Sequence, residues 1–514
     1  MAAQTGDLPR STPVEQGVDT MMLNDFINSL ATLPDVDVHH LMILRHGKVI
    51  VERHYSPYRA TDLHTLYSAS KTVTGLAVGL AVDDGLLTID DKVSKFLRDK
   101  MPAELSPALD SLTVRDLLTM TSGRKEDLSI LMGDADWLTT WFAGEFSGAG
   151  KRFNYDSMCS HALAVIVSRL TGKKLHDYVS ERIFRPLNIT TSDWELAPDS
   201  VEAGGWGLRL HVESEAKLGQ LLLQEGKWNG QQLISSQWIH DMTQRHVSTR
   251  RKAPELPLTE RILNFFRGIW HEVRSWFTGY NVDDYFLGYG YQIKAIQRPF
   301  AECYFAAGYG GQIINVVPKC DMVIVFNGRA ATYGDELNML YDKLIEPMVR
   351  EEYPTTAATV DPSPGVVMPM GQPEHPLEQR LFAGTLQLED NLLGIKTINV
   401  APQGKNRIFT MTDQRGPLRA VASCGEWCLT TSDERPIYIM ETREQLVGTK
   451  RPFTSAAAYA WQGNTLDLRL DWIDGGDNRR LSISFNEQGS VTIIANDNYD
   501  SLLSDTIQAK LIPN

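Results

Sequence analysis

The feature that most limits how this chain can fold is a change in hydrophobic periodicity after residue 374. Before residue 350, apolar residues recur at helical spacing between short strand-like runs. Residues 351–374 are rich in Pro, Thr and Gly, which predicts a linker. A chain of 514 residues exceeds a single ordinary core. We therefore expect a first domain at residues 1–350, a linker at 351–374 and a second domain at 375–514.

The second domain is predicted to be all-β, because its apolar residues alternate with period two between polar turns. Eight or so short strands are expected, at Gly384–Leu388, Ile395–Val400, Arg407–Met411, Trp427–Thr431, Tyr459–Trp461, Thr465–Trp472, Leu481–Phe485 and Ser490–Ile494. So many short strands indicate an antiparallel barrel or sandwich. The segment carries no catalytic set of side chains.

The first domain mixes helices and strands. A helix is expected at Met21–Leu33, and His40–Glu52 is typical of a hairpin that turns at His46–Gly47. Leu112–Gly123 predicts a short capped helix with a glycine stop, and Ala162–Leu170 an apolar helix that ends at Thr171-Gly172. This mixture predicts an α/β (α+β) fold.

The most reactive arrangement in the sequence is Ser68-Ala69-Ser70-Lys71, followed by a helical run at Thr72–Val82. A serine three residues before a lysine at a helix start shares a face with it. Ser68 would also lie near the unpaired N–H groups of that helix end. A partly desolvated lysine can take the proton of a serine hydroxyl. The pattern predicts Ser68 as an acyl-forming nucleophile and Lys71 as its proton partner, although a simple helix cap at Ser68 is the alternative.

The same S-x-x-K spacing occurs a second time, at Ser214-Glu215-Ala216-Lys217. Here a structural interpretation is available: Ser214 caps a helix at Glu215–Gln224, and Lys217 faces solvent. The motif alone is therefore weak evidence, and the surrounding sequence has to decide between the two copies.

The surrounding sequence resembles the serine β-lactamase-related family. The runs D-G-L-L-T-I-D-D-K-V at 84–93 and L-T-V-R-D-L-L-T-M-T-S-G at 112–123 carry this resemblance. Further matches follow in the same order, at Phe153–Ser157, Ile183–Ile189, Gly204–Leu208 and Gly226–Gly230. The family includes class C β-lactamases, D-Ala-D-Ala carboxypeptidases, family-VIII-type esterases, D-aminopeptidases and 6-aminohexanoate-dimer hydrolases. The ordered series covers roughly residues 15–350 and is far more specific than one motif.

The resemblance implies a β-lactamase/transpeptidase-like domain, with an antiparallel sheet flanked by helices, and a lipocalin-like C-terminal domain. It places the family's nucleophile at Ser68, its lysine at Lys71 and its motif tyrosine at Tyr155. A phenol held near an ammonium can act as general base and then acid. The third position of the tyrosine motif, normally asparagine, is Ser157. A hydroxyl there can still bond Lys71 or a substrate carbonyl.

The last motif of the family falls in Tyr304–Gln312, which leads into a strand at Ile313–Val317. Where relatives carry K-T-G or H-x-G, this chain has Ala306-Ala307-Gly308. The resemblance implies that Ala306, Gly308 and Gly310 line the substrate site with Ser157, and that the amides of Ser68 and Tyr309 form the oxyanion hole. Alanine at position 306 offers no charge to a substrate carboxylate, which argues against an efficient β-lactamase or carboxypeptidase.

Residues Arg250–Asp284 form an insertion between these motifs. Ile262, Phe266, Ile269, Val273 and Trp276 fall on one helical face. Three interpretations stay open: a lid or aromatic wall over the active site, a dimer contact or interfacial anchor, and an ordinary core helix.

Composition narrows the classes of partner. A formal net charge of −14 argues against nucleic acid and anionic membrane surfaces. No apolar run is long enough to span a bilayer. Met1–Gln16 lacks the pattern of a signal peptide, so we expect a cytoplasmic protein, or a periplasmic or secreted one if a signal peptide was removed.

Cysteine and histidine spacing predicts neither a disulfide scaffold nor a metal site. The five cysteines are few and odd in number, and Cys424 and Cys428 lack the second pair that a zinc site needs. One disulfide or simply buried thiols are the alternatives. The twelve histidines form no H-E-x-x-H motif, so no metal and no cofactor are expected.

These observations favour a serine hydrolase, acting as a monomer or homodimer, that cleaves a small-molecule ester or amide through an acyl-enzyme on Ser68. The alternatives are a penicillin-binding-type sensor with slow deacylation, a β-lactamase or D-aminopeptidase, and an acyltransferase that uses the same residues. No G-x-S-x-G motif is present, so the α/β-hydrolase route has no support.

Overall fold

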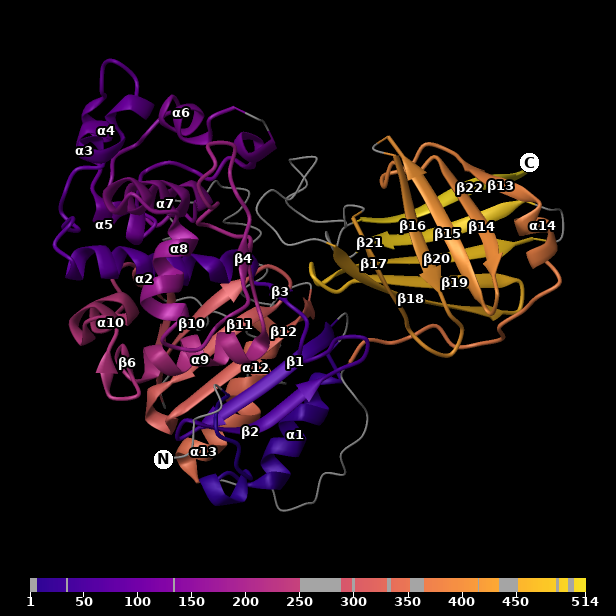
Figure 1. Cartoon of the computed structure of the whole chain (residues 1–514), viewed down its shortest axis with the longest axis horizontal. Helices are drawn as coiled ribbons and strands as arrows, with labels where there is room; N and C mark the ends of the chain where they lie inside the picture. Colours follow the sequence, from indigo (N-terminus) through magenta and orange to yellow (C-terminus); the bar gives the residue numbers. More distant parts are fainter. Residues whose placement is uncertain are drawn as a thin grey trace, which may run out of the picture.

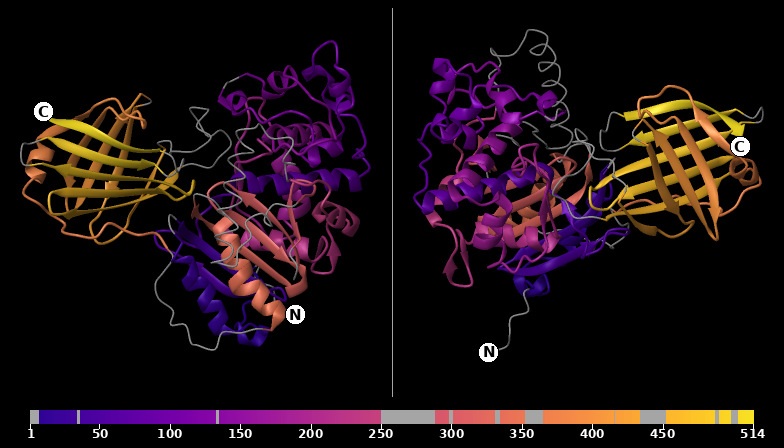
Figure 2. Two further views of the ribbon diagram at one scale, coloured as in Figure 1. Left: turned by 180° about the vertical axis from the view of Figure 1, so that it is seen from behind. Right: turned by 45° about the horizontal axis from the view of Figure 1, so that its top comes forward.

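The computed structural model describes the chain except for residues 1–6, 34–35, 133–134, 250–287, 298–300, 331–333, 352–364, 415, 434–451, 487–489 and 498–502. The predicted helix within Arg250–Asp284 lies outside the described residues, as does most of the predicted linker at 351–374. The described chain forms two lobes, a larger one of helices and sheet and a smaller one of strands alone (Figure 1). Figure 2 shows the same division from two other sides.

The larger lobe is built on a seven-stranded sheet with the order β2-β1-β12-β11-β10-β9-β8. Every neighbouring pair is antiparallel. The strands are β1 (Val36–Arg45), β2 (Lys48–His54), β8 (Gly288–Tyr289), β9 (Lys294–Gln297), β10 (Glu302–Gly308), β11 (Gln312–Val317) and β12 (Met322–Ala330). The predicted hairpin is β1 and β2, so that prediction is confirmed.

Helices cover both faces of this sheet. On one face, α1 (Thr20–Leu30), α12 (Gly334–Leu340), η9 (Tyr341–Ile345) and α13 (Glu346–Arg350) contribute to a core with the strands. On the other face lies the larger core, which includes α2 (Ser70–Asp83), α5 (Val114–Leu118), α6 (Trp137–Phe142), α7 (Ser157–Thr171), α8 (Leu175–Val179), α9 (Val212–Leu223) and α10 (Ser236–Thr243). The lobe also contains the short helices α3 (Ser94–Leu97) and α4 (Pro107–Asp110). Two small sheets belong to it as well. One has the order β3 (His64–Thr65), β5 (Leu208–Leu210) and β4 (Asp193–Trp194), and the other pairs β6 (Lys227–Trp228) with β7 (Gln231–Gln232).

The helix boundaries follow from capping residues. Thr113 and Asp116 form a reciprocal capping box at the start of α5. Asp156 caps α7 by accepting a hydrogen bond from the Met158 N–H, and Gly172 ends that helix at φ 65°, in the left-handed region. The expected helices at 112–123 and 162–170 are therefore present, and α7 starts five residues earlier than its apolar run.

The interpretation of the second S-x-x-K copy is wrong in two respects. Ser214 lies inside α9, whose N-cap is His211, so it does not cap the helix. Lys217 is buried rather than solvent-facing. Its ammonium lies 3.9 Å from Glu213 one turn earlier, and burial lowers its pKa. Lys217 lines a hollow with Leu8 and Pro9 of the N-terminal segment, a neighbourhood that no local sequence pattern predicts.

The smaller lobe is a ten-stranded antiparallel barrel with the order β16-β15-β14-β13-β22-β21-β20-β19-β18-β17. Its strands are β13 (Gly384–Leu388), β14 (Thr397–Gln403), β15 (Asn406–Asp413), β16 (Gly416–Ala422), β17 (Cys428–Ser432), β18 (Phe453–Gln462), β19 (Thr465–Trp472), β20 (Asp477–Phe485), β21 (Val491–Asp497) and β22 (Leu503–Pro513), with α14 (Glu378–Phe382) alongside. A parallel bridge between Ser423 and Ala458 brings β16 and β18 together, so the barrel is nearly closed.

The barrel prediction is confirmed, with two strands more than expected. Alternation along β19 shows why the pattern worked: Leu466, Leu468 and Leu470 point into the core, whereas Thr465 and Asp467 are half-buried on the outside. The unexpected strands are β16 and β22.

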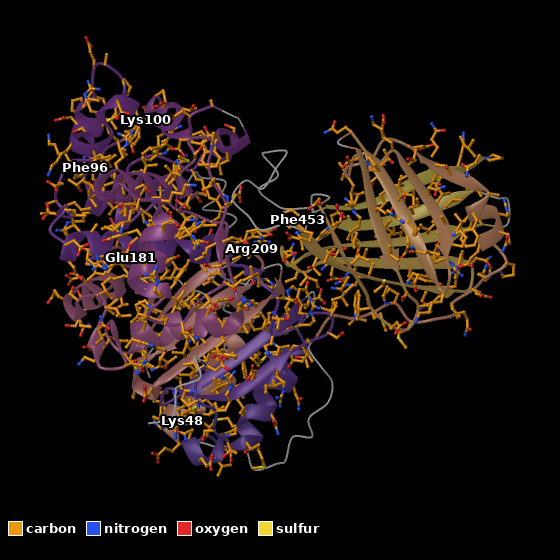
Figure 3. All side chains as sticks on the ribbon, in the orientation of Figure 1. Lys48, Phe96, Lys100, Glu181, Arg209 and Phe453 are labelled. Carbon is orange, nitrogen blue, oxygen red and sulfur yellow. The ribbon has the colours of Figure 1, made fainter. Side chains whose placement is uncertain are left out.

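The lobes meet through buried charges and aromatic contacts. Arg469 of the barrel donates to Asp37 of β1 at 2.7 Å, and Arg480 donates to the same carboxylate at 2.8 Å. The guanidinium of Arg209 lies 5.6 Å from the ring centroid of Phe453, and Figure 3 shows both labelled residues where the two lobes come together. The barrel is thus packed against the larger lobe.

The five cysteines all lie among the described residues and form no disulfide: Cys159, Cys303 and Cys320 are buried, and Cys424 and Cys428 are half-buried. Among the residues that the structure describes, we find no helix that combines the length and the apolarity needed for a membrane span.

Candidate active site

Ser68 sits in a short 3-10 turn, η2 (Tyr67–Ala69), between strand β3 and helix α2. The turn is fixed on both sides of Ser68. The Leu66 N–H donates to the Leu208 carbonyl at 2.8 Å, and the Leu208 N–H donates to Ser70 Oγ at 3.1 Å. Ser70 Oγ in turn donates to the Tyr67 carbonyl at 2.6 Å. Ser68 therefore lies one short turn ahead of the α-helix rather than within its first turn.

Lys71 is fully buried behind this turn and makes three hydrogen bonds. Its Nζ donates to Ser68 Oγ at 3.0 Å, to Ser157 Oγ at 3.2 Å and to the Gly205 carbonyl at 2.7 Å. Burial lowers the pKa of the Lys71 ammonium to about 8, although the nearby Glu126 and Asp156 carboxylates act to raise it. An amine with this pKa is neutral often enough near pH 8 to accept a proton from Ser68.

The start of α7 supplies the next part of the site. Ser157, its first residue, donates from Oγ to Glu126 Oε1 at 2.8 Å, and its N–H donates to the same oxygen at 3.2 Å. Asp156 accepts from the Trp141 indole N–H at 2.8 Å, and burial raises the pKa of its carboxyl to about 6. These bonds fix where α7 begins and so where Ser157 meets Lys71.

Tyr155 directly precedes this helix and lies beside Lys71. The Lys71 Nζ is 4.8 Å from the centroid of the Tyr155 ring. A second ammonium, that of Lys294 on β9, lies 5.9 Å from the same centroid. The half-buried Tyr155 ring thus has two ammonium groups within 6 Å of its centroid.

The last predicted motif is the end of strand β10 and the turn after it. A Cβ built on Gly308 would lie 2.0 Å from the Leu66 carbonyl oxygen, so the strand end touches the residue that leads into the Ser68 turn. The Tyr309 ring packs edge-on against Tyr67, with centroids 5.8 Å apart. Ala306 is almost fully buried in the core, and Gly310, at φ 75°, faces Arg329.

The structure therefore brings Ser68, Lys71, Tyr155 and Ser157 together, with Gly308 and Tyr309 against the adjoining turn. Ala306 and Gly310 lie in the same motif but make no described contact with these four residues.

Three groups of this site were missed in the sequence. Glu126 lies in an irregular loop 31 residues from Ser157, so no periodic pattern points to it. Gly205 contributes a backbone carbonyl, which residue type does not reveal. Lys294 pairs with Phe305 in the sheet, and only the strand register shows how near it comes to Tyr155. Of these three residues, only Gly205 could have been suspected from the sequence, because it lies in the Gly204–Leu208 run that resembles a family motif.

Within the described ranges, no three His, Cys, Asp or Glu side chains come close enough together to hold a metal ion.

A comparison with protein families identifies what this architecture is. The family model described as Beta-lactamase matches residues 39–340, more than half of the chain. The chain belongs to the beta-lactamase family. The matched span holds Ser68, Lys71, Tyr155, Ser157 and the β10 motif, and the resemblance predicted from the motifs is confirmed. The enzyme is a serine hydrolase of this family, with an additional C-terminal barrel.

Curated relatives of this beta-lactamase-family protein are distant. It is 25% identical over 248 residues to an uncharacterised protein of Alkalihalophilus pseudofirmus. The aligned region covers 43% of this chain and 68% of that relative. It is 24% identical over 248 residues to 6-aminohexanoate-dimer hydrolase of Paenarthrobacter ureafaciens, with 42% and 62% covered. Against Protein flp of Staphylococcus aureus it is 23% identical over 198 residues, with 35% and 38% covered. The last two matches thus span less than two thirds of those proteins.

Similar solved structures include an octameric penicillin-binding protein homologue from Pyrococcus abyssi, which is 15% identical, with a TM-score of 0.48 over 96% of this chain and 100% of that one. The D-amino acid amidase of Ochrobactrum anthropi is 12% identical, with a TM-score of 0.48. The alignment covers 65% of this chain and 99% of the amidase.

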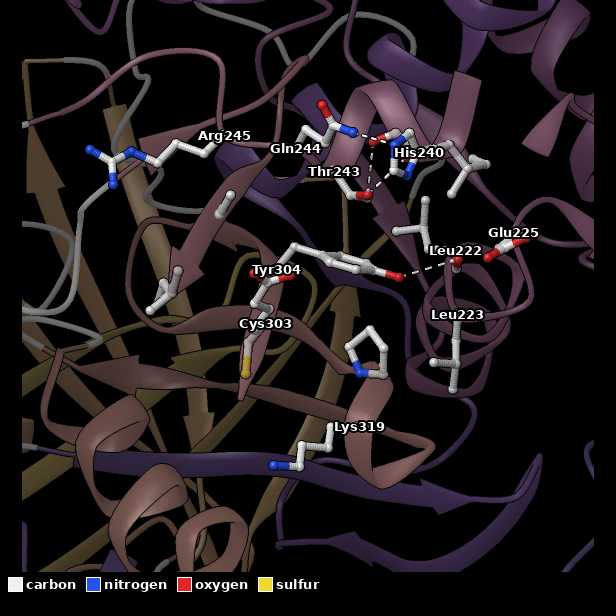
Figure 4. A pocket seen from close by; sticks show the side chains of 15 residues that line it. Leu222, Leu223, Glu225, His240, Thr243, Gln244, Arg245, Cys303, Tyr304 and Lys319 are labelled. Atoms are coloured by element: carbon white, nitrogen blue, oxygen red, sulfur yellow. Dashed lines mark hydrogen bonds between the residues drawn. The ribbon is translucent and has the colours of Figure 1, made fainter. Parts of the chain in front are cut away.

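A separate hollow of about 570 Å³ lies between the end of α9, α10 and strands β9 and β10. Figure 4 shows Tyr304 reaching across it, where its hydroxyl donates to the Leu222 carbonyl at 3.3 Å. None of Ser68, Lys71 and Tyr155 lines this hollow. It is therefore distinct from the candidate active site of this beta-lactamase-family hydrolase.

Proposed function

We propose that this hydrolase cleaves a carboxylic ester or a linear amide through an acyl-enzyme on Ser68. The observation that carries the proposal is the buried Lys71 ammonium, which contacts Ser68 Oγ at 3.0 Å and whose pKa burial lowers to about 8. A lysine held this way can exchange a proton with the serine hydroxyl at ordinary pH.

In the proposed mechanism, Ser68 Oγ attacks the substrate carbonyl carbon while Lys71 takes its proton. The Ser68 and Tyr309 amides hold the oxyanion. Tyr155, beside Lys71, passes a proton to the leaving oxygen or nitrogen, and the acyl–leaving group bond breaks. Water then attacks the acyl-enzyme, deprotonated Tyr155 takes the proton of the water, and Lys71 returns to Ser68 the proton that it took as the acid departs.

The side chains around Lys71 support an ester or linear amide more than a β-lactam. Ser157 stands where the family carries asparagine, and it spends its hydroxyl hydrogen on Glu126. Ala306 offers no cation to a substrate carboxylate. The curated relative named 6-aminohexanoate-dimer hydrolase is consistent with a linear amide. Lys294 is the opposing consideration, because its ammonium near Tyr155 could attract an anionic substrate.

The test is turnover of a small panel by the full chain. The panel contains p-nitrophenyl acetate, p-nitrophenyl butyrate, nitrocefin, a D-amino-acid p-nitroanilide and a linear ω-amino-acid amide. Ser68→Ala should abolish turnover. Ser214→Ala is the matched control, because it changes the serine of the second S-x-x-K copy, which lies inside α9, and it should leave turnover unchanged.

The outcomes separate the alternatives. Turnover of esters or amides that Ser68→Ala abolishes supports the proposal and selects the bond. Fast nitrocefin hydrolysis would instead favour a β-lactamase. A single burst without turnover would favour a sensor that deacylates slowly, and product formed only with an added alcohol or amine acceptor would favour an acyltransferase. Activity that survives Ser68→Ala rules the mechanism out.

A further inference from the structure

A loop of the barrel reaches the segment that leads into the nucleophile turn. The loop, Ile473–Gly476, joins β19 to β20. A Cβ built on Gly476 would lie 2.8 Å from His64 Cε1, so the loop backbone rests directly on His64 of β3. Asp474 of the same loop lies 3.7 Å from Arg209, which pairs with Thr65 across the small sheet. The barrel therefore contacts the strand that runs into Tyr67 and Ser68.

Asp477, the first residue of β20, directly follows this loop and makes a buried hydrogen bond to the residue before Ser68. The Tyr67 hydroxyl donates to Asp477 Oδ2 at 2.5 Å, across 410 residues of sequence. Tyr67 is 3% exposed and Asp477 is 1% exposed, so water does not compete for either group. Burial raises the pKa of the Asp477 carboxyl to about 7, and in either protonation state an unprotonated oxygen remains to accept from the Tyr67 hydroxyl.

The backbone conformation of Tyr67 is unfavourable and requires stabilising contacts. Its φ is 44°, in the left-handed region that a bulky aromatic residue rarely adopts. A residue keeps such a conformation only when its surroundings determine it. The Ser70 Oγ bond to the Tyr67 carbonyl holds its backbone. Two contacts hold its side chain: the Asp477 carboxyl at the hydroxyl, and the Tyr309 ring edge-on at 5.8 Å. The next residue along the chain is Ser68, whose Oγ lies 3.0 Å from Lys71 Nζ.

We propose that Asp477 of the barrel is a positioning residue for the Ser68 nucleophile. Its carboxylate holds the Tyr67 phenol, which fixes the left-handed backbone of the nucleophile turn and thereby aims Ser68 at Lys71. The proposal rests on the proposed function, because it gives Ser68 the nucleophile's role. It assigns the barrel a part in the reaction, although the barrel contributes no group that touches the reacting atoms.

The hydrogen bond is tested with variants of the full chain. Asp477→Ala removes the acceptor, Tyr67→Phe removes the donor, and Asp477→Asn keeps a side-chain oxygen in the acceptor position. The readouts are the rate at which a fluorophosphonate labels Ser68, and kcat and KM for p-nitrophenyl butyrate, each per folded molecule. We expect Asp477→Ala and Tyr67→Phe each to lower the labelling rate and kcat about tenfold, the effect of one lost hydrogen bond. KM should change little, Asp477→Asn should retain most of the rate, and the double variant should be no slower than either single one.

Arg480→Ala is the control for barrel docking in general. It removes one ion pair to Asp37 at another part of the interface and should leave the labelling rate per folded molecule unchanged, even where it lowers the melting temperature. If Asp477→Ala fails to fold, Tyr67→Phe, which alters no charge, answers the same question.

Wild-type labelling rates in both Asp477→Ala and Tyr67→Phe would overturn the inference while leaving the proposed function intact. Additive losses in the double variant would also overturn it, because the two side chains would then act separately. If Ser68 of the wild-type chain is not labelled at all, the proposed function fails, and this inference fails with it.

Discussion

The Lys71 ammonium donates to the carbonyl oxygen of Gly205 at 2.7 Å, the shortest of its three hydrogen bonds. That carbonyl can only accept, so it keeps one Lys71 hydrogen away from Ser68 in every protonation state. The bond also ties helix α2 to the Gly204–Leu208 turn, where Thr74 Oγ1 donates to the Gly204 carbonyl at 2.7 Å. Backbone atoms therefore help to hold the amine in place before any substrate binds.

Lys71→Met should remove the proton partner while keeping a side chain of similar length. We expect kcat/KM to fall about 10²–10⁴-fold, the usual contribution of a general base. The matched control is Lys217→Met, which changes the lysine of the second S-x-x-K copy and should leave kcat/KM within about twofold. The measurement is ester hydrolysis by equal amounts of folded protein. Equal losses in both variants would show that Lys71 acts through folding rather than chemistry.

The pH dependence of turnover should report the same amine. Burial lowers the pKa of Lys71 to about 8, and the neutral form that accepts the Ser68 proton grows as pH rises. We therefore expect kcat/KM to rise about tenfold per pH unit below about pH 8 and to level off above it. The check is a pH profile of an ester substrate from pH 5.5 to 9.5, corrected for its spontaneous hydrolysis. A profile that is flat between pH 6 and 9 would contradict the assignment.

The parts of the site that the sequence predicted are those fixed by local geometry or by the family motifs. Ser68 and Lys71 are three residues apart, so their approach needs only a helical turn. Tyr155 and Ser157 came from the resemblance, and the structure places both beside Lys71. Glu126 could not be found, because its contact depends on how an irregular loop crosses the start of α7.

The same distinction holds for the fold. Strands with strict alternation, such as β13 and β19, were predicted at the residues where they occur. In strand β16, Pro417 and Arg419 interrupt the run of strand-forming residues. Strand β22 does alternate, with Ile507, Ala509 and Leu511 separated by polar residues, but it was not among the predicted strands. The prediction that Lys217 faces solvent was wrong for another reason. Lysines are mostly exposed, so the sequence favours exposure unless the element that covers the side chain is known.

Glu126→Gln should shift the pH profile. The Glu126 carboxylate raises the pKa of Lys71, so neutralising it should lower that pKa further and move the acidic limb of kcat/KM to lower pH. The glutamine oxygen can still accept from Ser157, which keeps the hydrogen bond. Glu104→Gln, which removes one exposed carboxylate elsewhere, is the control for net charge and should leave the profile unchanged. A shift toward higher pH in Glu126→Gln would contradict this account of the electrostatics.

Gly308→Ala tests how closely strand β10 approaches the nucleophile turn. The new Cβ would stand 2.0 Å from the Leu66 carbonyl oxygen, so either the strand end or the turn has to move. We expect a loss of about 1–3 kcal/mol in the free energy of unfolding, as for other overpacked sites. Turnover per folded molecule should fall as well, because Ser68 follows Leu66 by two residues. Ala307→Gly, on the opposite face of the strand, is the comparison, with a loss of about 0.5–1 kcal/mol and normal turnover. Urea unfolding and ester turnover give both quantities.

Arg469→Met tests the buried charges that join the lobes. Arg469 is 2% exposed and donates to Asp37 of β1 and to Asp471 of its own strand. Its removal leaves two carboxylates without their main cation in a buried site, which typically costs about 3–5 kcal/mol. Arg480→Met is the matched comparison, because Arg480 also bonds Asp37 but its side chain is 42% exposed, so its loss should cost about 0–1 kcal/mol. Thermal melts and the rate of proteolysis between the lobes measure the difference. Equal effects of the two variants would mean that Asp37 is solvated in the folded protein, and that the lobes are held together mainly by their apolar contacts.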